Sequence, residues 1–236
     1  MRATASLLRV LLPALLIFCL AAYLAGVLAS FALDADRMQA KFELYSNPEL
    51  SGLEAGQYAS LAKSITGYLN HDRESAQLEL IRFGEKQEAF SEKELLHLSD
   101  IRGLVDTAKL LRLLALGMAA LGLVVFFVLR KLNPGLLKRV RPQKTLAGSL
   151  IAIFVLAVAL TACALADFDS LFYLFHQILF RNDLWLLNPQ KDLLIQLMPS
   201  AFFTSYGQDF LKQTWPVLLS LPLAAFAFFK AGRAEK

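Results

Sequence analysis

The chain has 236 residues, of which 56% are hydrophobic and 19% are charged. An ordinary soluble domain carries about 25% charged residues, and the apolar excess is gathered here in long blocks. This composition excludes a disordered chain, a nucleic-acid-binding arm and a conventional soluble enzyme.

Four apolar runs are the main predicted elements, since each approaches the about 20 residues that cross a bilayer. They are residues 10–33, 104–129, 145–166 and 213–229. The second run reaches its full length only if Lys109 and Arg112 extend to the membrane surface. We therefore predict a mainly α fold, a polytopic membrane protein with four transmembrane helices and a small α+β extracellular cap. The first run could instead be a cleaved signal peptide, although it exceeds the about 7–15 apolar residues of such signals.

Basic residues give these segments a direction. The N-terminus, the loop 130–144 and the C-terminal tail are rich in Lys and Arg, and Glu235 is the one acidic residue among them. Because short cytoplasmic loops concentrate basic residues, we expect both termini on the cytoplasmic side. The cap, residues 34–103, and a second large segment, 167–212, then lie on the outer side. The pI of 9.1 follows from this topology and suits contact with lipid headgroups, so no nucleic-acid partner is expected.

The cap is expected to combine a helix with a hairpin. The apolar spacing over residues 53–69 predicts the helix. Residues 78–83 alternate as a strand does, and residues 87–90 could return as its partner after a turn at 84–86.

A second cap helix is predicted to begin at about Glu92, because Ser91 and Glu94 form a capping-box pattern. A straight helix from His97 to Leu113, where the uncharged part of the second run begins, would lift His97 about 24 Å above that point. We expect Gly103 to permit a bend that folds the cap helix down along the membrane surface. The alternative is that the membrane helix begins near Leu104.

The second outer segment is rich in aromatic residues. Residues 168–180 are too short to cross a bilayer, so we interpret them as an interfacial or re-entrant segment. A further aromatic group follows at Trp185, Phe202, Phe203 and Tyr206. We expect this whole segment to be wedged at the membrane surface.

Acid/base catalysis by histidine is the chemistry that remains once the other common catalytic motifs are excluded. The sequence has no HExxH, no GxSxG and no glycine-rich phosphate loop, and its histidines have no metal-ligand spacing. Cys19 and Cys163 lie within predicted membrane helices, where thiols are usually packing residues. All three histidines, His71, His97 and His176, fall on the predicted outer side.

Two of the histidines are candidates for acid/base work. His97 has Asp100 three residues later on the same helical face, where a carboxylate could hold one ring nitrogen and set the tautomer. His176 lies in an apolar segment, where a polar ring must find a partner. A solvated surface histidine and a satisfied structural histidine are the alternatives. His71 looks like a turn residue and is left out.

Two stretches resemble a known family. The first runs from Phe175-His176 through Asn182 to Trp185 and continues with Asn188-Pro189, Asp192–Ile195, Met198-Pro199 and Phe202-Phe203; the second runs from Phe90 through His97 to Leu104. Together they resemble the lipoprotein intramolecular transacylase family, Lit, which consists of bacterial four-helix integral membrane proteins. Ser200 departs from the resemblance, since an acidic residue is expected after the Met-Pro pair.

The resemblance implies an activity, a substrate and a location. The substrate would be a diacylated bacterial lipoprotein, whose sn-2 acyl chain moves onto its own N-terminal α-amine to give the lyso-form. His97 and His176 would be the catalytic pair, with no metal, nucleotide or other cofactor. The protein would span the bacterial cell membrane, in contact with membrane lipids, with its active site on the outer face.

Further residues could support the substrate or the oxyanion of the tetrahedral intermediate. Arg102, Asn182 and the Trp185 indole are donors within the two stretches that could hold the oxyanion; their alternative roles are headgroup or Asp partner, turn cap and interface anchor, respectively. The remaining supporting candidates are Asp100, Tyr173 and Tyr206.

Two other readings remain open. A lipid hydrolase or an intermolecular acyltransferase could use the same histidines, and a non-enzymatic accessory or sensor subunit could use them to respond to pH. The distance between His97 and His176 discriminates between enzyme and accessory subunit.

Overall fold

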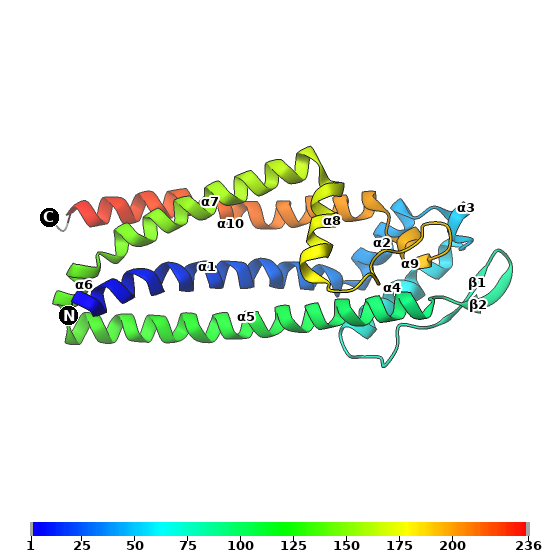
Figure 1. The fold of residues 1–236 in the computed structure, drawn as a ribbon, viewed down its shortest axis with the longest axis horizontal. Helices are drawn as coiled ribbons and strands as arrows, with labels where there is room; N and C mark the ends of the chain where they lie inside the picture. Colours follow the sequence, from blue (N-terminus) through cyan, green and yellow to red (C-terminus); the bar gives the residue numbers. More distant parts are fainter. Residues whose placement is uncertain (1, 235–236) are drawn as a thin grey trace. The chain divides into compact units, whose positions relative to one another are not determined.

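A computed structural model describes residues 2–234, and Figure 1 shows their fold. Glu235 and Lys236 of the predicted basic tail lie outside the described residues, as do the side chains of Arg2, Lys138, Arg139 and Arg233. In chain order the elements are α1 (Arg2–Ala32), α2 (Ala35–Tyr45), α3 (Pro48–Ser51), the 3₁₀ turn η1 (Ala55–Gln57), α4 (Tyr58–Leu69), β1 (Glu79–Arg82), β2 (Glu85–Glu88), α5 (Glu92–Leu132), α6 (Pro134–Val140), α7 (Pro142–Ala166), α8 (Phe168–Leu179), α9 (Leu193–Leu197) and α10 (Ser200–Ala234). The predicted mainly α class with a small sheet is confirmed.

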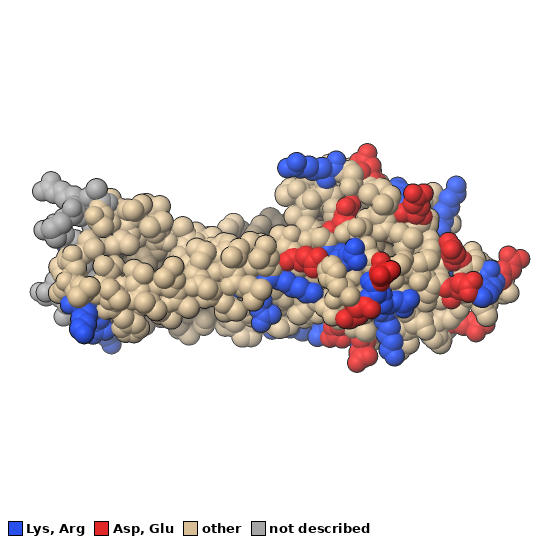
Figure 2. All heavy atoms as spheres, turned by 90° about the horizontal axis from the view of Figure 1, so that it is seen from below, with Lys and Arg blue, Asp and Glu red and all other residues tan. Residues whose placement is uncertain are grey.

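The first compact unit consists of the first part of α1, the later parts of α5 and α10, and the whole of α6 and α7. Its buried core is small and includes Leu150, Leu218 and Ala225. Most of its large apolar side chains face outward instead, among them Leu121, Phe127 and Leu160. Figure 2 shows this surface almost free of charge except at its ends, and the described part of the unit contains no Asp or Glu. Such a surface suits lipid as its solvent.

Three helices among the described residues are long and apolar enough to span a membrane. They comprise Ser6–Ala32, Glu92–Leu132 and Pro142–Ala166. They overlap the first three predicted membrane segments. The fourth, residues 213–229, forms part of α10, which contains Pro216 and Pro222 and is not among these three. A topology of four spans with cytoplasmic termini stays a prediction.

The second compact unit consists of residues 27–109 and 167–210. Its core gathers side chains from α2, α4, α5, α9 and α10, including Phe42, Leu61, Leu98, Leu197 and Phe202. Charged residues of both signs cover its surface in Figure 2. This unit holds all three histidines, so the candidate site is built within it.

The hairpin in this unit is shifted from its predicted position. β1 pairs with β2 in antiparallel register, with Arg82 opposite Glu85, so the turn consists of Phe83 and Gly84. Both turn residues have positive φ, 53° and 83°. A two-residue hairpin of this kind requires left-handed backbone at both positions, which places the turn one residue earlier than predicted and starts the returning strand two residues earlier.

Two helix predictions need correction, and one is confirmed. The cap helix expected from residue 53 begins at Tyr58, because Gly52 takes left-handed backbone (φ 65°) and η1 intervenes. The bend expected at Gly103 is wrong: α5 continues through it as one helix (Figure 1). A glycine in a helix interior weakens the helix by about 1 kcal/mol without interrupting its hydrogen bonds. The capping box at Ser91 is confirmed and starts α5 at Glu92.

Candidate active site

His97 and His176 meet inside the second unit. His97 projects from α5 and His176 from α8, and their ring centroids lie 6.3 Å apart with an angle of 37° between the planes. Both side chains are buried, with His97 5% and His176 9% exposed. Two polar rings are thus removed from water together, an arrangement that a solvated surface histidine does not show.

Helix α8 presents His176 on its buried face. The helix begins where the Asp167 carboxylate accepts a hydrogen bond of 3.0 Å from the backbone N–H of Ser170, which caps the first turn. Phe172 lies one turn before His176, and its ring centroid is 4.2 Å from the imidazole centroid. The opposite face is apolar and exposed at Leu174 and Ile178, as the predicted interfacial segment requires.

Aromatic rings enclose the pair. Phe180 contacts both histidines, with centroid distances of 5.2 Å to His97 and 5.5 Å to His176. Trp185 lies 5.0 Å from His176 at 32°, and Tyr173 packs edge-on against Trp185. The histidines therefore sit in an apolar surrounding, which strengthens electrostatic interactions between groups placed there.

The hydrogen bonds of the two rings differ. Nδ1 of His176 is 2.8 Å from the carbonyl oxygen of Phe172, and because a carbonyl only accepts, Nδ1 carries a proton. In the neutral ring Nε2 then keeps its lone pair. Nδ1 of His97 is buried without a hydrogen-bond partner among the described residues. A buried polar atom without a partner is unfavourable in the resting protein and is available to a bound molecule.

Burial keeps both rings neutral. The pKa of His97 is lowered to about 4, mainly by burial; the neighbouring His176 acts in the same direction, whereas Asp100 acts in the opposite direction. Burial also lowers the pKa of His176, with the hydrogen bond to Phe172 acting against it. At neutral pH the pair can accept a proton from a bound group.

Asp100 does not bond His97 as predicted. Its carboxylate accepts a hydrogen bond of 2.9 Å from the side-chain amide of Asn182, which links α5 to the segment after α8. Asp100, Asn182 and Phe180 form part of the lining of a cavity of about 270 Å³. Since Phe180 also contacts both imidazoles, the cavity adjoins the histidine pair.

The other predicted supporting residues lie at different distances from the pair. Trp185 is in contact with it, and Tyr173 touches it through Trp185. Arg102 instead stacks over the ring of Tyr68, 4.1 Å from the ring centroid.

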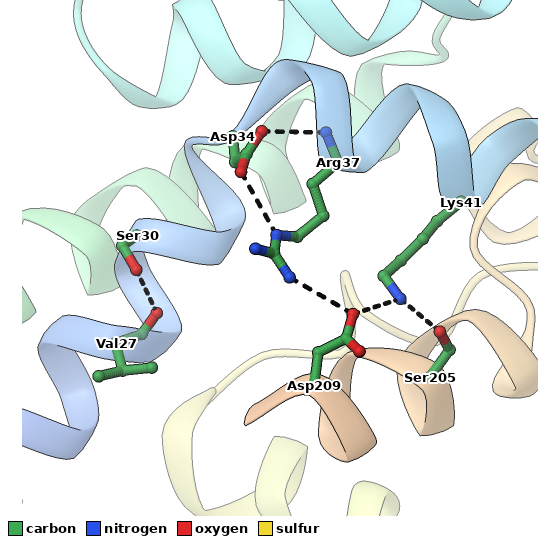
Figure 3. Close-up of polar contacts among 7 residues, drawn as sticks. All are labelled: Val27, Ser30, Asp34, Arg37, Lys41, Ser205 and Asp209. Atoms are coloured by element: carbon green, nitrogen blue, oxygen red, sulfur yellow. Dashed lines mark hydrogen bonds and ion pairs between the residues drawn. The ribbon is translucent and has the colours of Figure 1, made fainter. Parts of the chain in front are cut away.

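Tyr206 belongs to a separate polar cluster, shown in part in Figure 3. Its hydroxyl is buried without a hydrogen-bond partner among the described residues, and burial raises its pKa. Lys41 lies over its ring and forms an ion pair of 2.8 Å with Asp209, which Arg37 also contacts at 3.4 Å. This cluster ties α2 to α10 (Figure 3).

His71 lies apart from the pair, as the sequence suggested. Its Nε2 is 2.8 Å from a carboxylate oxygen of Asp106, and both side chains are largely exposed. Its φ of 65° fits a turn residue. No group of three or more His, Cys, Asp or Glu side chains among the described residues is arranged to hold a metal ion.

The sequence did not point to several residues that build the site. Phe172 and Phe180 stand four residues on either side of His176, so helical spacing could have identified them. Glu94 is 2% exposed and accepts hydrogen bonds from the backbone N–H groups of Ser91 and Leu194. Local patterns cannot reveal its contact with Leu194, nor that of Lys41 with Asp209, because the partners are distant in sequence.

Comparison with known proteins identifies one family. The family model described as lipoprotein intramolecular transacylase Lit matches residues 10–203. No curated protein matches the chain.

Solved structures of the membrane integral lipoprotein intramolecular transacylase Lit from Bacillus cereus share this fold. One is 18% identical, with a TM-score of 0.59 over 99% of this chain and 96% of its own. Two variants of that protein, in which a histidine is replaced by arginine or by alanine, are each 19% identical over 97% of this chain. Their TM-scores are 0.56 and 0.57, with 92% and 94% of their own chains covered.

Proposed function

The chain belongs to the lipoprotein intramolecular transacylase family, and from this premise we propose that it moves the sn-2 acyl chain of a diacylglyceryl-cysteine lipoprotein onto the lipoprotein's own α-amine. It is an acyltransferase and a membrane protein, as its family and its apolar helices require. We place it in the bacterial cell membrane with the active site on the outer face, on the strength of its basic loops.

One observation carries the proposal: two buried imidazoles, from distant parts of the chain, lie 6.3 Å apart between ring centroids. The reaction needs a group that takes a proton from the amine and a group that gives one to the leaving glycerol oxygen. Imidazole performs both steps near neutral pH. The third histidine, His71, pairs with a surface carboxylate and has no place in this scheme.

The atoms and protons of this reaction balance without a further reagent. The amine nitrogen attacks the sn-2 carbonyl carbon, the new C–N bond forms and the ester C–O bond breaks. The proton that leaves the nitrogen ends on the glycerol oxygen. Amine and ester belong to one molecule, so holding them in line supplies much of the acceleration, up to about 7–11 kcal/mol in ideal cases.

His176 is the better placed base. Its Nδ1–H is fixed on the carbonyl of Phe172, so its Nε2 presents a lone pair. Its lowered pKa keeps that lone pair free at neutral pH. Two imidazolium charges so close together in an apolar surrounding repel each other strongly, so the pair takes up at most one added proton and carries at most one positive charge. That proton then returns to the leaving oxygen, from His176 or by way of His97.

Supporting roles follow from position. Trp185 lies against His176, so its indole N–H is the donor we propose for the tetrahedral oxyanion. Asn182 is engaged with Asp100 and acts as a positioning residue. Tyr173 holds Trp185 in place. Arg102 contacts Tyr68 and Tyr206 contacts Lys41, so we assign neither residue a role in the reaction.

The test is the product formed on a reporter lipoprotein. Mass spectrometry of its N-terminal peptide in cells with the wild-type chain should show the N-acyl lyso-form. His97→Ala and His176→Ala should each abolish it while the protein still inserts, and the matched control His71→Ala should retain it. Normal N-acylation in either pair variant would overturn the proposed mechanism.

The same experiment separates the other readings. A free fatty acid with an unmodified α-amine would identify a lipid hydrolase. Acylation of a different lipid would identify an intermolecular transferase. No change in the reporter with or without the wild-type chain would favour an accessory subunit.

A further inference from the structure

The cavity beside the histidine pair has a lining of mixed chemistry. Asp100 and Ser99 border it from α5, and Arg181 and Asn182 border it from the segment after α8. Phe180 contributes an apolar wall. Hydrogen-bond donors and acceptors thus face one small space with apolar surface between them.

The charge of the lining selects against an ionic ligand. Asp100 is acidic and Arg181 is basic, so their formal charges cancel. A phosphate or an ammonium group would favour an excess of the opposite charge. A peptide main chain, with N–H donors and C=O acceptors side by side, matches a lining that offers both kinds of partner.

The size of the cavity limits what it can hold. Its volume of about 270 Å³ is below the roughly 300–1,000 Å³ of pockets that take a whole small ligand. Two long acyl chains do not fit such a space, and they would place hydrocarbon against the charged groups of Asp100 and Arg181. A short stretch of peptide does fit.

The position of the cavity agrees with the geometry of the substrate. Phe180 forms part of its wall and also contacts both imidazoles. If the α-amine of the substrate cysteine lies at the histidines, the next residue of the lipoprotein would lie beside Phe180 and the cavity. We propose that the cavity is a peptide subsite, which binds the main chain of the first residues that follow the acylated cysteine. This subsite rests on the transacylase function proposed above.

Gly103 keeps the subsite open. It lines the cavity, and a Cβ added there would meet no other atom within 4 Å, so the missing side chain leaves room for a ligand. Gly103 lies inside α5, where alanine would strengthen a helix by about 1 kcal/mol. A leucine at 103 would therefore add side-chain volume at the wall of the cavity, with a Cβ that meets no other protein atom.

The test compares two substrates on three forms of the full-length protein in detergent. The substrates are an S-diacylglyceryl-cysteine carboxamide and the same lipid-bearing cysteine extended by four residues. The proteins are wild type, Gly103→Leu and Gly117→Leu. Gly117 is the matched control because it lies on the same helix, outside the cavity, and an added Cβ there also meets nothing within 4 Å.

We expect the wild type to prefer the extended substrate in kcat/KM by about tenfold, the factor given by 1.4 kcal/mol. Gly103→Leu should bring this ratio close to one, mainly through the extended substrate, while the carboxamide is still converted. Gly117→Leu should keep the wild-type ratio.

The outcomes are distinguishable. An equal preference in wild type and Gly103→Leu, or no preference in the wild type, would overturn the subsite while leaving the transacylase function intact. Absence of N-acyl product from both substrates with the wild type would overturn the proposed function, and the subsite with it. Thermal unfolding of each variant shows whether a change in rate comes from a misfolded protein.

Discussion

The carboxylate of Glu94 accepts a hydrogen bond of 2.6 Å from the backbone N–H of Leu194, and thereby joins the first turn of α5 to the start of α9. Its second oxygen accepts bonds of 2.7 and 2.8 Å from the backbone N–H and hydroxyl of Ser91. Glu94 precedes His97 by about one helical turn. The relationship therefore fixes the part of α5 from which His97 projects.

Glu94→Ala should destabilise the protein by about 2–4 kcal/mol, because it removes the carboxylate acceptor of the buried Leu194 N–H and of the partly buried Ser91 N–H. Thermal unfolding in detergent measures this loss. The matched control is Glu92→Ala, an exposed residue of the same first turn, which should change stability by less than about 1 kcal/mol. Equal effects of the two substitutions would contradict the structural role of Glu94.

The sequence predicted the elements whose signals are local. Uncharged runs identified the apolar helices, and the Ser91–Glu94 pattern located the start of α5. The register of the hairpin and the continuity of α5 were harder to predict. The hairpin turn depends on left-handed backbone at Phe83, and a single glycine does not decide whether α5 bends. These depend on packing that a local pattern does not contain.

The site was predictable in its centre and less so around it. His97 stood out because Asp100 follows on the same helical face, and His176 because it lies in an apolar segment; both also fall in the stretches that resemble the Lit family, and the structure brings them together. The predicted bond from Asp100 to His97 failed because Asn182, distant in sequence, takes that carboxylate. Partners so far apart in the chain follow from the tertiary fold alone.

A second stability prediction concerns the ion-pair cluster of Figure 3. Lys41 is 8% exposed, and Asp209 holds both its ammonium and the guanidinium of Arg37. Asp209→Ala should destabilise the protein by about 2–4 kcal/mol, because a buried charge loses its partner.

The control for this cluster is an exposed ion pair in the same unit. Lys86 and Glu79 are 68% and 64% exposed across the hairpin, so Lys86→Ala should change stability by less than about 1 kcal/mol. Thermal unfolding of both variants measures the two changes in stability. If Asp209→Ala were as mild as Lys86→Ala, the buried cluster would not link α2 to α10 as inferred.

Trp185 should affect both the rate and its pH dependence. Both Trp185→Phe and Trp185→Ala remove the indole N–H, so each should lower kcat by about 10²–10³-fold if this group binds the oxyanion. Only Trp185→Ala also uncovers His176. Burial lowers the pKa of His176, so uncovering it should raise that pKa towards its usual value.

The measurement is the pH profile of kcat/KM with a lipopeptide substrate. The acid limb assigned to His176 should move to higher pH in Trp185→Ala, whereas Trp185→Phe, which retains an apolar ring, should leave it near its wild-type position. A shift of equal size in both variants would show that Trp185 does not control the protonation of His176 by burial.

Acidification should destabilise the folded protein through His97. Its pKa is about 4 in the fold and about 6.5 in an unfolded chain, so between these values the unfolded state binds more protons. The stabilisation is therefore complete above pH 6.5 and is lost as the pH falls towards 4, by a total on the order of 3 kcal/mol at 1.36 kcal/mol per pKa unit. Thermal unfolding of the wild type at pH 7.5 and at pH 5 should show the fall, and His97→Ala should reduce the difference. His176, whose pKa is also lowered, accounts for part of the dependence that remains. An unchanged difference in His97→Ala would mean that burial does not hold this ring neutral.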